Sequence, residues 1–85
     1  MAVYLVTWDN PLQDYTRLQA FVKAYDAMRF TDSAYAIAAE QDAEALYAAL
    51  RPSMAQDDVA YVVRLDAPWI GYGYEAMNDW LKRHL

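Results

Sequence analysis

The chain has 85 residues, too few for two separate hydrophobic cores, so the sequence predicts a single domain over residues 1–85. It contains no cysteine, which excludes disulfides, thiolate zinc sites and cysteine nucleophiles. Twelve acidic against seven basic residues give a net charge of −5, without the basic surface typical of proteins that bind nucleic acid. No signal peptide is recognised and no apolar run approaches the roughly 20 residues that cross a bilayer. We therefore expect a soluble, cytoplasmic protein with no membrane contact.

The first half of the chain predicts a strand, a helix and a hairpin. β-Branched and aromatic residues over 2–8 indicate a strand that is apolar on both faces, which is typical of a strand covered on both sides. From about Gln13, apolar residues recur at three- and four-residue spacing as far as Met28, which indicates an amphipathic helix with Asp14 in its first turn. Two short strands, at about 27–31 and 34–38, are expected to follow around a hairpin loop.

The second half predicts a helix, a strand and a C-terminal extension. Asp42 is a good N-cap, so a helix is expected over 43–50, with Pro52 ending or bending it. The residues from 59 to 65 alternate as in a strand, with Val59, Tyr61, Val63 and Leu65 facing one way. Residues 66–74 are expected to be irregular, and a short helix follows over about 75–84.

This order of elements predicts an α+β fold, a ferredoxin-like β-α-β-β-α-β sandwich with both helices on one face of a four-stranded antiparallel sheet. The other face is expected to be apolar, and either the extension (residues 66–85) or a second copy of the chain must cover it. We assign Tyr4, Val6 and Trp8 to this open face. Together with Trp69 from the extension, they form the predicted homodimer interface.

Asp9 is the main candidate for chemistry, because it ends the first strand at the edge of the sheet. A carboxylate there can hold Mg²⁺ or Mn²⁺, and in a two-fold dimer two copies of Asp9 could share one metal ion. The alternative is that Asp9 bonds the backbone of its own turn around Asn10 and Pro11. A single Asp before a proline turn favours this alternative.

The other polar and aromatic candidates are expected to be structural. Asp57 and Asp58 indicate a solvated turn, and Ser33 has no histidine partner for a catalytic triad. His84, the only histidine, is expected at a frayed helix end, where a cation suits the helix dipole. Four rings of the extension are expected to pack over the open sheet face rather than to stack on nucleic-acid bases: Trp69, Tyr72, Tyr74 and Trp80.

Five segments of the chain together resemble a known family: YLVTWD at 4–9, QDYTRL at 13–18, TDSAY at 31–35, DDVAYVVRL at 57–65 and DWLKRHL at 79–85. They are similar to the small SinR-like proteins, a group similar in fold to the small CRISPR-associated adaptation nuclease and to VapD-type toxins. The resemblance implies a ferredoxin-like fold and a homodimer formed on the open sheet faces. From the CRISPR-associated relatives it also implies that Asp9 is a metal ligand for nuclease activity. Trp8 departs from the Tyr usual before that Asp, and the loop from Asp9 to Gln13 is shorter.

Two functions from different classes follow. The first is a non-enzymatic homodimeric module that binds another protein, in a microbial or phage defence setting. The acidic charge and the lack of a set of catalytic residues favour this function. The second is a phosphodiesterase that cleaves RNA or DNA, in which Asp9 from both subunits positions Mg²⁺ or Mn²⁺ and an attacking water.

Overall fold

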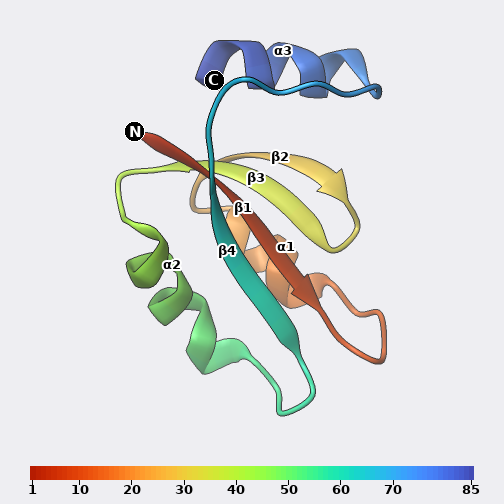
Figure 1. The fold of residues 1–85 in the computed structure, drawn as a ribbon. Coiled ribbons are helices and arrows are strands. Elements are labelled where there is room, and N and C mark those ends of the chain that lie inside the picture. Colours follow the sequence, from red (N-terminus) through yellow and green to blue (C-terminus); the bar gives the residue numbers. More distant parts are fainter.

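The computed structural model describes residues 1–85 as one sheet with three α-helices. The strands are β1 (Ala2–Asp9), β2 (Asp26–Thr31), β3 (Ala34–Ala39) and β4 (Val59–Leu65). The helices are α1 (Thr16–Val22), α2 (Ala43–Leu50) and α3 (Glu75–His84), with a short 3-10 helix (Arg51–Ser53) after α2. All neighbouring strands are antiparallel in the order β2-β3-β1-β4, as Figure 1 shows. The predicted ferredoxin-like α+β fold is confirmed.

The main core lies between the sheet and the helices α1 and α2. From β1 it takes Tyr4, Val6 and Trp8, which are only 4 %, 0 % and 2 % exposed. The helices contribute four buried side chains to it: Leu18, Val22, Leu46 and Leu50. The assignment of Tyr4, Val6 and Trp8 to the open face and to a dimer interface is therefore wrong. Because β1 is apolar on both faces, its alternation separates two sets of side chains but does not say which set faces the helices.

A second, smaller core lies on the opposite face of the sheet, under α3. Trp80 and Leu81 of α3 pack there on Val3, Ala36 and Ala38. The two alanines of β3 leave room for the large indole close to the sheet. In Figure 1, α3 lies apart from α1 and α2, at the end of the sheet where β1 begins. The extension thus covers one part of this face.

None of the three helices is long and apolar enough to span a membrane.

The helix boundaries differ from the sequence prediction at α1 and agree at α2. The first helix was expected from about Gln13 to Met28, but it spans only Thr16–Val22. The chain leaves the helix because Asp26 and the residues after it pair with β3, and this sheet pairing overrides the helical spacing. At α2 the predicted cap is confirmed, since the Asp42 carboxylate accepts the N–H of Ala45 at 2.8 Å.

Candidate functional site

Asp9 ends β1, and its carboxylate takes part in the turn that leads to α1. Asp9 Oδ1 accepts the backbone N–H of Asn10 at 2.9 Å and the hydroxyl of Tyr15 at 3.2 Å. Partial burial of the phenol, together with the Asp9 charge, raises the pKa of Tyr15. The structural alternative, in which Asp9 bonds its own turn, is confirmed for this oxygen.

The Asn10 side chain holds the rest of the turn. Its Oδ1 accepts the N–H groups of Leu12 and Asp14, both at 3.1 Å, and its Nδ2 donates to the Asp14 carbonyl at 2.6 Å. The Asp14 carboxylate in turn accepts the N–H and the hydroxyl of Thr16, which lowers the pKa of Asp14. Asp14 thus lies before α1 and bonds its first residue, Thr16, instead of lying in the first turn. This network fixes the place of Asp9 relative to α1.

A metal ion at Asp9 would need ligands from outside this chain. Asp9 and Asp57 are the two carboxylates that line a shallow hollow at this end of the sheet, beside Asn10 and Val59. No group of three or more His, Asp or Glu side chains in the chain is placed to hold a metal ion. Mg²⁺ does bind proteins through one or two carboxylates when water or phosphate completes its shell. The role of Asp9 as metal ligand or catalytic residue stays a prediction.

Asp58 is a buried structural carboxylate, so the prediction of a solvated turn is wrong for this residue. Its side chain is only 2 % exposed. Asp58 Oδ2 accepts the indole N–H of Trp8 at 3.0 Å and the N–H of Ala55 at 2.9 Å, and the Arg17 guanidinium lies 3.6 Å away. These hydrogen bonds, above all the one from Trp8, lower the pKa of Asp58. Asp58 therefore joins β1, α1 and the start of β4, while Asp57 stays exposed.

His84 is docked on the sheet, so the prediction of a frayed helix end is also wrong. Its Nε2 lies 2.8 Å from Asp26 Oδ2 on β2, and its ring stacks on Trp80 with 4.0 Å between ring centroids. Trp80 itself donates its indole N–H to Asp26 Oδ1 at 2.9 Å. Trp80 and, to a smaller extent, His84 lower the pKa of Asp26. Sequence spacing did not connect Asp26 with His84, because 58 positions separate them.

The part of the open face that α3 leaves uncovered is apolar. Leu5 of β1 lies there, half-buried, opposite Val63 of β4. Val59, Tyr61 and Val63 are 54 %, 65 % and 50 % exposed. We call these four residues, Leu5, Val59, Tyr61 and Val63, the β4 patch. The alternation along β4 predicted that Val59, Tyr61 and Val63 share one face of the sheet. The ferredoxin-like order places this fourth strand at an edge, and that position is the signal in the sequence that these side chains are exposed.

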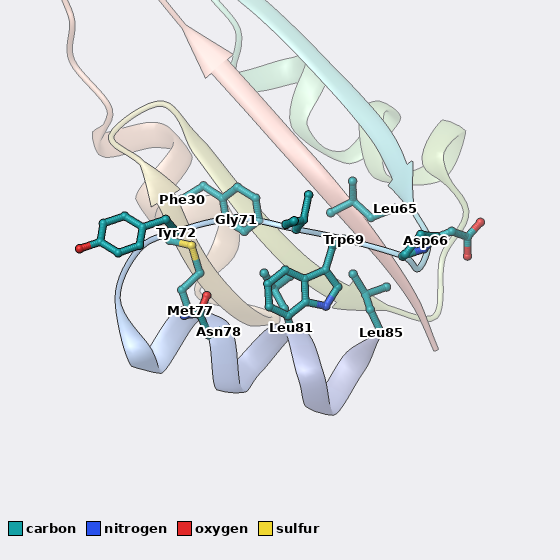
Figure 2. A pocket seen from close by; sticks show the side chains of 12 residues that line it. Phe30, Leu65, Asp66, Trp69, Gly71, Tyr72, Met77, Asn78, Leu81 and Leu85 are labelled. Atoms are coloured by element: carbon teal, nitrogen blue, oxygen red, sulfur yellow. The ribbon is translucent and has the colours of Figure 1, made fainter.

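A groove of about 350 Å³ lies between α3 and the segment that connects it to β4. Figure 2 shows Trp69, Leu81 and Leu85 together in this groove. Trp69 is half-buried against the core under α3 and does not belong to the β4 patch. Of the four rings expected to cover the open face, Trp69 and Trp80 pack on it, but Tyr72 and Tyr74 are exposed.

Comparison with known proteins gives no match. No protein-family model, curated protein or solved structure is significantly similar to this chain. The resemblance to the SinR-like proteins therefore rests on the five segments quoted above and stays a prediction.

Proposed function

We propose that the protein is a non-enzymatic protein-interaction module that acts as a homodimer, with a second copy pairing along β4. The observation that carries this proposal is the edge of the sheet at β4. This strand pairs with β1 on one side, has no strand on its other side, and presents Val59, Tyr61 and Val63 half-exposed on the open face.

The two edges of the sheet differ in how they are protected against pairing. At the β2 edge the register shifts between Arg29 and Thr31, and the strand carries the charged side chains of Asp26 and Arg29. Bulges and charges of this kind keep edge strands from pairing with other chains. The β4 edge has an unbroken register, no proline and no lysine, and Arg64 is its one charged residue. An unprotected edge strand is a common site for the addition of another strand.

The partner that we propose for this edge is a second copy of the chain. Antiparallel pairing of β4 with itself about a two-fold axis places the β4 patch beside the same patch of the partner. Burying the exposed halves of Val59, Tyr61 and Val63 would contribute about 1 kcal/mol for each side chain in each copy. This apolar gain and the strand hydrogen bonds between the two copies are the contributions that oppose the entropic cost of association.

The experiment is light scattering coupled to gel filtration over a range of micromolar concentrations. We expect a mass of twice the chain mass of 9.8 kDa for the unmodified protein and of one chain for Val63→Lys. The matched control is Ile70→Lys, the same kind of change at a residue that is 99 % exposed and outside the β4 patch. It should stay dimeric. A monomeric wild type, or a Val63→Lys variant as dimeric as the control, would reject the proposal.

The alternative function, a metal-dependent nuclease, needs a different dimer. Asp9 lies opposite Val59, the first residue of β4. Antiparallel pairing of two β4 strands puts the two Val59 residues at opposite ends, about 20 Å apart along the strands. A metal shared by two Asp9 carboxylates would therefore require the open faces to pack against each other instead.

An activity assay separates the two functions. RNA and DNA, single- and double-stranded, are incubated with the protein and Mg²⁺ or Mn²⁺, beside the Asp9→Ala variant. We expect no cleavage above that of a mock purification. Metal-dependent cleavage that Asp9→Ala abolishes without unfolding would favour the nuclease over the interaction module.

A further inference from the structure

The C-terminal end of α3 is attached to β2 through one histidine. His84 Nε2 lies 2.8 Å from Asp26 Oδ2, and His84 Nδ1 lies 2.8 Å from the Trp80 carbonyl oxygen. The imidazole also lies flat on the Trp80 indole, with 15° between the ring planes. Only 19 % of the His84 side chain is exposed. The ring is thus held on three sides by groups of its own chain.

Both ring nitrogens of His84 face hydrogen-bond acceptors, a carboxylate and a carbonyl. A neutral imidazole carries one N–H, so either tautomer leaves a nitrogen lone pair pointing at an oxygen 2.8 Å away. The doubly protonated ring donates to both acceptors. Its positive charge also lies in the last turn of α3 and over an indole face, and both places favour a cation.

We infer that His84 is a proton-dependent clasp, which holds α3 on the sheet when its ring is doubly protonated and loosens α3 when the ring is neutral. Loosening would expose the apolar floor on which Trp80 and Leu81 pack, at Val3, Ala36 and Ala38. The inference depends on the α3 contacts alone and does not require that β4 forms a dimer.

The charged groups around the clasp set its pH range. The carboxylate of Asp26 on β2 faces the ring, and Arg83 on α3 adds a further positive charge near that carboxylate. Because the pKa of Asp26 is lowered, its contribution is lost only as the pH falls below the ordinary carboxylate range. On the alkaline side, loss of the second ring proton leaves a nitrogen lone pair facing one of the two acceptor oxygens, so one hydrogen bond is lost and the clasp opens. Docking of α3 should therefore be strongest at mildly acidic pH.

The test is amide hydrogen exchange measured by NMR on the full chain, at about pH 5.5 and about pH 8.5, with rates corrected for intrinsic exchange. In the wild type, protection of the α3 amides should fall by about tenfold or more between the two pH values, relative to the amides of β1. In His84→Gln, α3 protection should be low and equal at both values. Equal protection of wild-type α3 at the two pH values would overturn the inference.

Two further variants separate the clasp from a general effect of charge. Lys82→Gln removes a positive charge from the same turn of α3 and should keep the pH dependence. Asp26→Asn removes the carboxylate that faces the ring and should abolish the pH dependence. If Lys82→Gln removes the pH dependence as fully as His84→Gln does, the His84 contacts are not its cause.

Discussion

Replacement of Trp80 by phenylalanine tests how α3 is held on the sheet. Trp80 is 2 % exposed, and its indole N–H donates to Asp26 at 2.9 Å. Phenylalanine keeps an aromatic ring on Ala36 and Ala38 but has no donor for Asp26. We expect α3 to open far more often while the rest of the domain stays folded.

The size of this effect follows from two losses. A hydrogen bond to a charged group contributes about 1.5–3 kcal/mol, but water can solvate Asp26, whose side chain is 58 % exposed, so about 1 kcal/mol is expected here. The smaller ring gives up a further ~1 kcal/mol of apolar burial. The sum, about 2 kcal/mol, corresponds to an increase of roughly thirtyfold in the opening equilibrium of α3.

Hydrogen exchange measured by NMR on Trp80→Phe reads this opening directly. Amides of α3 should lose about thirtyfold in protection, whereas amides of β1 and α2 keep theirs, because the second core is separate from the main one. The control is Trp69→Phe, the same replacement at a tryptophan that packs beside the second core but not on Asp26. A uniform loss of protection across the chain would refute the idea that α3 opens on its own, and an unchanged α3 would refute the importance of the Asp26 bond.

Two further predictions concern the hydrogen-bonded carboxylates and the main core. Stability should fall as the pH drops below about 4, because hydrogen bonds lower the pKa of the Asp14, Asp26 and Asp58 carboxylates and protonation of each removes a contribution present at neutral pH. Thermal melts of Asp58→Asn should show a smaller loss of Tm between neutral and acidic pH than the wild type, and an equal loss would exclude Asp58 as a source of the acid sensitivity. Leu46→Ala, at a fully buried position, should cost about 2–5 kcal/mol in urea unfolding, and a loss below about 1 kcal/mol would contradict the assignment of Leu46 to the core.

The sequence predicts the elements well because local patterns determine most of them. The alternation over β4, the Asp42 cap and the helical spacing in α2 and α3 each act within a few residues. The end of α1 is different, since it depends on strand pairing between Asp26 and Ala38. The local spacing of apolar residues extends the predicted helix to Met28, and only the pairing of β2 with β3 determines where the helix ends.

The functional features are harder to predict, because each depends on residues far apart in the chain. Asp58 looks like a turn residue until Trp8 and Arg17 are seen around it. In the same way, His84 resembles a helix end until Asp26 is placed beside it. Asp9 bonds within its own turn, so its partner lies next to it in the sequence. One of the two alternatives predicted for Asp9, a hydrogen bond to the backbone of that turn, is therefore present.

Side-chain size explains why one face of the sheet is divided between α3 and solvent. Over β3 this face consists of the small residues Ala36 and Ala38, so α3 can approach and bury Trp80. Over β4 the same face carries Tyr61 and Val63, whose side chains stand up from the strand where α3 does not cover them. At the end of β4, Leu65 still packs against the core under α3, but Tyr61 and Val63 are left exposed at an unpaired edge. The division of this face therefore favours cover of the β3 half from within the chain and cover of the β4 half by another chain.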